Sequence, residues 1–137
     1  MNTKIVEGGC LCGAIRYRIT GKPRATSLCH CRTCRLAAGA PSVAWVVLDA
    51  ADLSFINGTP QVYYSSASIR RTFCSRCGTS LTYQRETESQ TIDVTTASLD
   101  SPDAFPPTRE IWLSHKLEWE RANEDMASYP QSSRSST

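Results

Sequence analysis

The sequence of 137 residues lacks any long apolar run, and this absence disfavours a membrane-spanning helix. No stretch approaches the roughly 20 apolar residues that a membrane-spanning helix needs, so we expect no membrane partner. The opening residues, Met-Asn-Thr-Lys-Ile-Val-Glu, also lack the apolar segment of a signal peptide. We therefore expect a cytoplasmic protein.

The patterns of several common functional sites are missing as well. The sequence contains no Ser/His/Asp set and no glycine-rich phosphate loop, and its only histidines are His30 and His115. Its aromatic residues are scattered, unlike those of a nucleic-acid stacking platform. Classical nucleophilic hydrolysis, nucleotide binding through such a loop and base stacking are therefore disfavoured.

Cysteine, in contrast, is abundant and clustered. The seven cysteines form three groups: Cys10 and Cys12; Cys29, Cys31 and Cys34; and Cys74 and Cys77. An odd count, together with the very small loops that C-x-C pairs would close, disfavours a disulfide framework. In a reducing compartment, clustered cysteines usually bind metal.

The number of ligands in each group predicts two different zinc sites. Structural zinc sites have four protein ligands, whereas catalytic sites keep one position open. The first and third groups together supply four thiolates, and the central group supplies three. We therefore predict two zinc ions per chain, a structural one bound by Cys10, Cys12, Cys74 and Cys77 and an open one bound by Cys29, Cys31 and Cys34.

Two alternatives remain for the central group. His30 or His115 could complete a closed structural zinc site, or a fourth cysteine from the other groups could complete an iron–sulfur cluster. If residues 29–31 are extended, alternation turns the ring of His30 away from the metal. An open site of three thiolates would suit the binding of a substrate thiolate better than the production of hydroxide, and this points to thiol chemistry.

The charge is divided unevenly along the chain. Residues 1–85 carry a net charge of +8, and residues 86–137 carry −6. The basic half could balance the thiolates, receive an anionic small molecule or bind nucleic acid, the last being the least favoured. The arginines nearest the cysteines are Arg32, Arg35, Arg70, Arg71 and Arg76. Each could hold a substrate carboxylate through two hydrogen bonds or balance the metal sites from the surface.

Short alternating segments predict a mainly β domain over residues 1–127. We expect strands over residues 4–7, 14–20, 42–48, 53–56, 69–73, 81–84 and 92–95. A short helix over 33–38 should end at Gly39 and begin beside Cys34. Trp45, Tyr63 and Tyr64 should lie in the core or a pocket wall, Asp49, Asp52 and Asp100 should cap turns, and Trp112, Leu113, Leu117 and Trp119 should anchor a C-terminal segment. The Ser-rich residues 128–137 predict a disordered tail.

The cysteine motifs resemble those of the glutathione-dependent formaldehyde-activating family, whose animal relative is centromere protein V. The resemblance rests on GCLCGAIRY at residues 9–17, CHCRTCR at 29–35 and RTFCSRCGT at 71–79. ASLD at 97–100 and the segment 111–119 add to it, so that it covers residues 5–120. The family often has a histidine where this chain has Glu110.

The resemblance implies a mainly β fold of several coiled antiparallel β-sheets clamped by zinc, similar to methionine-R-sulfoxide reductases. It implies the same division of ligands, with the four-cysteine set structural and Cys29, Cys31 and Cys34 at the catalytic zinc. The reaction of the family joins glutathione and formaldehyde to S-hydroxymethylglutathione and is classed with the carbon–sulfur lyases. In that reaction, glutathione's thiol takes the open zinc position and its thiolate attacks the aldehyde carbon.

Our leading hypothesis is a zinc-dependent carbon–sulfur lyase-type enzyme that acts on a small thiol, with glutathione the implied one, or on its aldehyde adduct. The alternative is a non-catalytic zinc-binding module that binds a partner or nucleic acid through its basic half. That module would have a fourth protein ligand and no pocket at the central cysteines. A third hypothesis, metal storage or thiol sensing, requires these cysteines to oxidise reversibly and release zinc.

Overall fold

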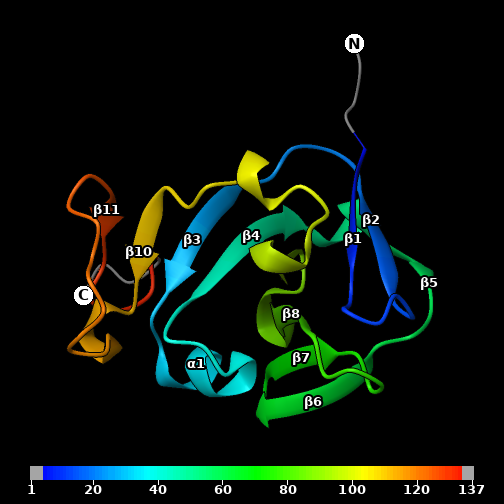
Figure 1. Cartoon of the computed structure of the whole chain (residues 1–137), viewed down its shortest axis with the longest axis horizontal. Coiled ribbons are helices and arrows are strands. Elements are labelled where there is room, and N and C mark those ends of the chain that lie inside the picture. Colours follow the sequence, from blue (N-terminus) through cyan, green and yellow to red (C-terminus); the bar gives the residue numbers. More distant parts are fainter. Residues whose placement is uncertain (1–4, 134–137) are drawn as a thin grey trace.

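The computed structural model describes residues 5–133, which form two β-sheets and one short α-helix (Figure 1). Strands make up most of the regular structure, so the predicted mainly β fold with several sheets is confirmed. No helix in residues 5–133 is long and apolar enough to cross a membrane.

The smaller sheet contains three antiparallel strands, β1 (Val6–Gly9), β2 (Arg16–Ile19) and β5 (Leu53–Asn57). The tight turn between β1 and β2 carries the first cysteine pair. The backbone N–H of Cys10 donates to Ile15 O at 3.1 Å, and that of Gly13 donates to Cys10 O at 3.1 Å. Gly13 has φ +82°, which glycine adopts without steric cost. This turn brings two cysteines onto the same loop.

The larger sheet contains eight strands. Their order is β11 (Ala127–Ser128), β10 (Arg109–Ile111), β3 (Ala25–Cys29), β4 (Val43–Asp49), β9 (Thr91–Thr95), β8 (Ser80–Arg85), β7 (Ile69–Phe73) and β6 (Gln61–Ser66). All neighbours are antiparallel except β10, which runs parallel to both β3 and β11. The single α-helix of residues 5–133, α1 (Arg32–Ala38), lies beneath the ends of β3 and β4 in Figure 1.

Alternation along β4 gives the larger sheet two different faces. Val46 and Leu48 are buried in the main hydrophobic core with Tyr17 of the smaller sheet. Trp45 and Val47, which point to the other face of β4, line a pocket. The sheet therefore separates the core on one face from a cavity on the other.

The segment after β10 does not follow the prediction of a disordered tail. β11 pairs with β10, the N–H of Tyr129 donates to Glu110 O at 2.9 Å, and the N–H of Trp112 donates to Gln131 O at 3.0 Å. The prediction is wrong for residues 128–133, because the backbone groups of β10 need partners and this segment supplies them. Residues 134–137 lie outside the described residues.

Three aromatic side chains are more exposed than predicted. Tyr63 and Tyr64 are 63% and 48% exposed because β6 is the last strand of the larger sheet and pairs with β7 only. Trp119, which we expected to anchor the C-terminal segment, is 71% exposed. Trp45 is buried, as predicted.

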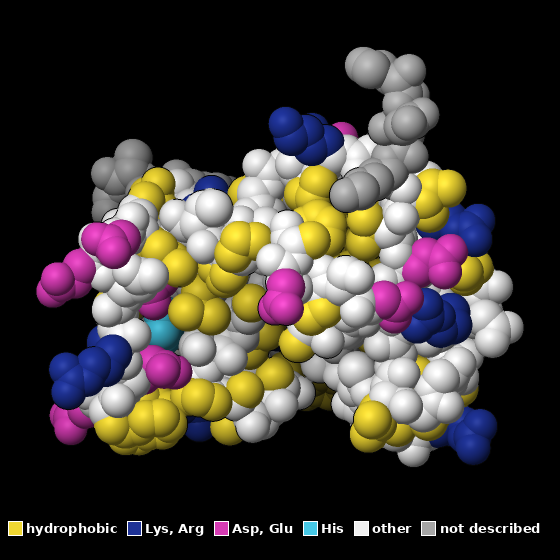
Figure 2. Space-filling view, turned by 45° about the horizontal axis from the view of Figure 1, so that its top comes forward, with side chains coloured by type: hydrophobic (Ala, Val, Ile, Leu, Met, Phe, Trp, Pro, Cys, Tyr) yellow, Lys and Arg dark blue, Asp and Glu magenta, His cyan; other side chains and the backbone are white. Residues whose placement is uncertain are grey.

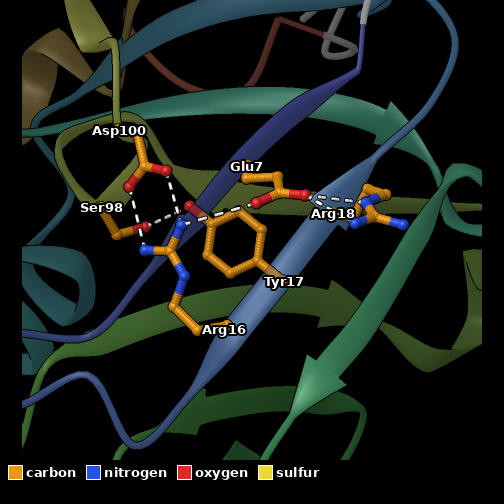
Figure 3. Close-up of polar contacts among 6 residues, drawn as sticks. All are labelled: Glu7, Arg16, Tyr17, Arg18, Ser98 and Asp100. Atoms are coloured by element: carbon orange, nitrogen blue, oxygen red, sulfur yellow. Dashed lines mark hydrogen bonds and ion pairs between the residues drawn. The ribbon is translucent and has the colours of Figure 1, made fainter.

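A polar network ties the smaller sheet to the segment that follows β9 (Figure 3). The guanidinium of Arg16 donates to both carboxylate oxygens of Asp100, at 3.0 and 2.5 Å. The hydroxyl of Tyr17 is hydrogen-bonded to that of Ser98 at 2.6 Å. Asp100, expected to cap a turn, is instead the ion-pair partner of Arg16, and Glu7 similarly pairs with Arg18 across β1 and β2 at 2.8 Å.

Candidate metal centre

The structure brings Cys10, Cys12, Cys74 and Cys77 together, and we call this group the four-cysteine cluster. Its ligand atoms all lie within 4.8 Å of one another. Two come from the turn between β1 and β2, and two from the turn that follows β7. The cluster therefore joins parts of the chain that are more than sixty residues apart, as its spacing in the sequence predicted.

Backbone donors point at the sulfurs of this cluster. The N–H of Ile15 donates to Cys10 Sγ at 3.2 Å, and that of Arg76 donates to Cys74 Sγ at 3.4 Å. The N–H of Gly78 donates to Cys74 O at 2.8 Å, with Gly78 at φ +81°. Such N–H donors stabilise thiolates, the form in which cysteine binds metal.

Cys29, Cys31 and Cys34 form the three-cysteine cluster. Cys29 ends β3, Cys31 caps the N-terminus of α1, and Cys34 lies in the first turn of that helix. The sulfurs of Cys29 and Cys34 are 3.7 Å apart, and the N–H of Cys34 donates to Cys31 Sγ at 3.3 Å. The helix, predicted over 33–38, covers Arg32–Ala38 and ends at Gly39 in a left-handed conformation.

Sulfur separations in both clusters fit a metal ion. The Sγ–Sγ distances are 3.6 Å for Cys10–Cys12, 3.8 Å for Cys12–Cys74 and 3.7 Å for Cys29–Cys34. Four sulfurs at ~2.3 Å from a central zinc ion would lie ~3.8 Å apart, whereas a disulfide needs ~2.0 Å. All seven cysteines are free thiols. Both clusters could therefore hold a soft metal ion such as zinc.

Hydrogen bonds and sulfur contacts shift the pKa values of thiols in both clusters. Hydrogen bonds with Cys29 and Cys34 lower the pKa of Cys31, and the contact with Cys31 raises that of Cys29. Hydrogen bonds with the hydroxyl and backbone of Thr79 lower the pKa of Cys77 to about 5. Each cluster therefore contains at least one thiol with a lowered pKa, which favours the thiolate form that binds metal.

The two histidines do not join the three-cysteine cluster. His30 is fully buried, and its Nε2 is 2.8 Å from Glu110 Oε1, so its ring turns away from the cysteines as alternation predicted. His115 Nδ1 accepts from the N–H of Arg32 at 3.2 Å. Within residues 5–133, the group of possible ligand atoms here contains cysteine sulfurs only. This speaks against a closed site with a histidine ligand.

A cavity of about 410 Å³ adjoins the three-cysteine cluster. The non-catalytic alternative predicted no pocket here, so this cavity speaks against it. Its walls come from the second face of the larger sheet, from α1 and from the C-terminal segment. The apolar part of the lining includes Trp45, Tyr83, Ile111 and Trp112, and the polar part includes Ser132 and Ser133.

Four arginines make this pocket cationic. They are Arg32, Arg71, Arg85 and Arg109, and Asp93 is the one acidic residue among the described lining residues. Sequence proximity to the cysteines pointed to Arg32 and Arg71 but missed the other two. Arg85 and Arg109 lie two residues from Tyr83 and Ile111 on their strands, so alternation puts each on the pocket face.

The other predicted arginines lie elsewhere. Nε of Arg35 donates to His30 O at 3.2 Å, and Arg70 and Arg76 do not line the pocket. Glu110, where the resembled family often has histidine, is absent from the lining too and is bonded to His30 instead. Residue 110 is therefore not part of the described pocket wall.

Basic side chains do not form a continuous patch on the face drawn in Figure 2. Lys and Arg side chains there are intermingled with Asp and Glu. Electrostatic binding of nucleic acid requires a stripe or patch of cations. This face does not offer one.

Together, the fold and the two clusters define a class: a mainly β protein with two thiolate sites able to bind metal, one of them at a cationic pocket. The sequence matches the family of the glutathione-dependent formaldehyde-activating enzyme over residues 5–115. The chain belongs to this family.

Individual proteins are similar to this chain in sequence or in fold. A Halomonas elongata protein named as a glutathione-dependent formaldehyde-activating enzyme is 29% identical, over 94% of this chain and 91% of its own length. An uncharacterised lyase of Schizosaccharomyces pombe is 37% identical over 55% of this chain and 54% of its own length. The crystal structure of a Rhodobacter sphaeroides protein has a similar fold, with a TM-score of 0.58 and 18% identity, covering 90% of this chain and 98% of that one.

Proposed function

We propose that this protein is a zinc-dependent carbon–sulfur lyase-type enzyme that acts on a small thiol and an aldehyde, with glutathione and formaldehyde the first pair to test. The observation that carries the proposal is a cluster of three cysteines, without a fourth protein ligand in residues 5–133, beside a pocket. Zinc sites with an open position are catalytic, and closed ones are structural. We accordingly assign a catalytic zinc to Cys29, Cys31 and Cys34 and a structural zinc to Cys10, Cys12, Cys74 and Cys77.

A zinc ion bound by the three-cysteine cluster would supply a position at which a substrate thiol loses its proton. The other contributions would come from the residues that line the pocket. Trp45 and Trp112 exclude water from the side of the pocket next to the cysteines. Exclusion of water at this side would strengthen the electrostatic interactions of a bound substrate thiolate.

The charge of the pocket favours an anionic thiol. Glutathione carries two carboxylates and one ammonium group at neutral pH, and the lining offers four arginines and one aspartate. Guanidinium groups bind carboxylates through two parallel hydrogen bonds. Nε of Arg109 donates to Ser27 Oγ at 2.6 Å, which fixes the direction of this guanidinium at the pocket wall. The cavity volume also falls within the ~300–1,000 Å³ typical of small-molecule sites.

Native mass spectrometry of the freshly purified, reduced protein, with and without glutathione, tests the proposal. We expect two zinc ions per chain and a glutathione adduct. In Cys31→Ser the adduct and the zinc of the three-cysteine cluster should be lost, because one of three ligands is gone. Ser101→Ala, at a position outside the pocket lining, is the control and should behave like the wild type.

Catalysis is measured in the same proteins as the rate of S-hydroxymethylglutathione formation from glutathione and formaldehyde. The wild type should exceed the spontaneous reaction, and Cys31→Ser should fall to the spontaneous rate. A wild type that binds one zinc, or an adduct that persists in Cys31→Ser, would contradict the proposal.

A further inference from the structure

Arg71 is a buried cation in contact with the three-cysteine cluster. It lies on β7 and is 6% exposed. Its Nη1 and Nη2 are 3.8 and 3.7 Å from Cys34 Sγ, and Nη2 also donates to Thr33 Oγ1 at 3.2 Å. Two residues of one turn of α1 therefore meet the same guanidinium.

The rest of the side chain is also held. Nε of Arg71 donates to Ser65 Oγ at 3.0 Å, and the guanidinium lies over the ring of Tyr83 at 5.0 Å from its centroid. With these contacts, the donors on all three nitrogens are directed at groups of the protein. Arg71 is therefore fixed, unlike an arginine that reaches into a pocket to hold a ligand.

The charge of Arg71 has no carboxylate partner among the ion pairs of residues 5–133. A buried cation is strongly destabilising unless an opposite charge compensates it. The sulfur of Cys34 is the group in contact with Arg71 that can carry a negative charge. The geometry therefore pairs this guanidinium with a thiolate.

We propose that Arg71 is a positioning residue for the metal centre at Cys29, Cys31 and Cys34: it fixes Cys34 as a ligand and offsets part of the cluster's negative charge. This inference rests on the proposed function, which places a zinc ion there. Three thiolates and Zn²⁺ together carry a net charge of −1, and the guanidinium brings the local sum to zero. An anionic thiol then approaches a neutral centre, so electrostatic repulsion is removed.

The proposed role of Arg71 also distinguishes it from the other arginines of the pocket. Arg71 was one of five candidates for holding a substrate carboxylate. Its contacts with Cys34 and Ser65 commit it to the metal centre instead. Arg32 on α1, and Arg85 and Arg109 on the same face of the sheet, then remain as the candidates for binding substrate carboxylates.

Metal affinity tests the inference independently of catalysis. The variants are Arg71→Met, which keeps the length of the side chain without its charge, and Arg71→Lys, which keeps a charge. Arg70→Met is the matched control, because Arg70 is the neighbouring cation on β7 and does not line the pocket. Zinc is withdrawn with a chromogenic chelator, and the zinc of the four-cysteine cluster serves as internal reference.

We expect Arg71→Met to weaken zinc binding at the three-cysteine cluster by ~10–100-fold, the range for loss of a residue that supports a metal ligand. Arg71→Lys should recover part of this affinity, and Arg70→Met should match the wild type. In the cobalt-substituted protein, the thiolate-to-cobalt charge-transfer band of Arg71→Met should move to longer wavelength. The reason is that removal of a nearby positive charge raises the energy of the sulfur electrons.

Because Arg71 lies three residues before Cys74, Arg71→Met could also disturb the fold. Ser65→Ala separates the two effects, because it removes only the hydrogen bond that aligns Nε of Arg71. It should also weaken zinc binding at the three-cysteine cluster, by a smaller factor than Arg71→Met. Unchanged affinity and an unshifted cobalt band in Arg71→Met would overturn the inference and leave the zinc assignment standing. A wild type without zinc at the three-cysteine cluster would overturn both.

Discussion

Both carboxylate oxygens of Glu110 have partners in the interior of the protein. Oε1 is 2.8 Å from His30 Nε2, and Oε2 accepts from the N–H of Asn123 at 2.5 Å. Glu110 and His30 are both fully buried. This one side chain therefore connects the segment of the three-cysteine cluster with β10 and with the C-terminal segment.

Glu110→Ala should lower the free energy of unfolding by about 3–5 kcal/mol, because it leaves a buried histidine and a backbone N–H without their partner. Glu110→Gln keeps the shape and one acceptor, so its loss should be about 1–2 kcal/mol. Urea unfolding of the zinc-loaded protein measures both. A loss below about 1 kcal/mol for Glu110→Ala would show that the pair contributes little net stability.

For individual residues, the sequence predicted the direction in which a side chain points more readily than the residue that it contacts. Alternation correctly turned the ring of His30 away from the cysteines. It could not show that Glu110, eighty residues later, receives that ring, because such a contact depends on the parallel pairing of β10 with β3. The short spacing of cysteines was informative because neighbouring ligands need no knowledge of the fold.

Strand β2 carries Tyr17, the tyrosine of the network in Figure 3. Tyr17 is 0% exposed, and burial raises its pKa from 10.0 to about 12. The folded protein therefore keeps the phenol proton up to about pH 12, whereas the unfolded chain releases it near pH 10. The contribution to stability is complete below pH 10 and is lost as the pH rises towards 12.

Between these two pH values the wild type should lose about 3 kcal/mol of unfolding free energy through Tyr17. In Tyr17→Phe this part of the pH dependence should vanish, although the lost hydrogen bond to Ser98 lowers stability at every pH. Urea unfolding from about pH 9 to pH 12 gives the slopes. Tyr63→Phe, at an exposed tyrosine, should keep the wild-type slope, and an equal slope in Tyr17→Phe would refute the assignment.

Elements whose apolar residues recur with a clear period could be predicted from the sequence. Elements that exist because they pair with another strand could not. The apolar alternation of β4 identified a central strand, and Gly39 marked the end of α1. β11 has only two residues, too few to show a period, and it exists because β10 offers an unpaired edge. Composition does not show which strand edge a segment can pair with. The Ser-rich residues after residue 127 therefore predicted disorder, whereas the structure has β11 paired with β10.

At the scale of the whole molecule, part of the pocket wall is formed by a segment for which the sequence predicted a disordered tail. Backbone N–H groups of Trp112, Leu113 and Ser114 donate to carbonyls of residues 129–131, and Ser132 and Ser133 line the cavity. Deletion of residues 127–137 should lower the free energy of unfolding by about 2–4 kcal/mol, at roughly 1 kcal/mol per hydrogen bond. It should also weaken the binding of glutathione, because one wall of the pocket is removed.

Urea unfolding and titration with glutathione, followed by calorimetry, measure the two effects. Deletion of residues 134–137 alone is the matched control. If the shorter deletion has the same effects, the described segment 127–133 is not their source.

The two cysteine clusters differ in how much of the chain must be in place before a metal can bind. The three-cysteine cluster lies within six consecutive residues, so an unfolded chain, or one still under synthesis, already presents its ligands together. The ligands of the four-cysteine cluster lie on two turns, beside β1, β2 and β7, that are more than sixty residues apart in the sequence, so the chain must bring these turns together before all four can bind one metal ion. A metal ion that also binds the unfolded chain stabilises the native state less than a metal ion that binds the native state only. A metal at the four-cysteine cluster would thus favour the completed fold, and a metal at the three-cysteine cluster could be acquired first and carried into it.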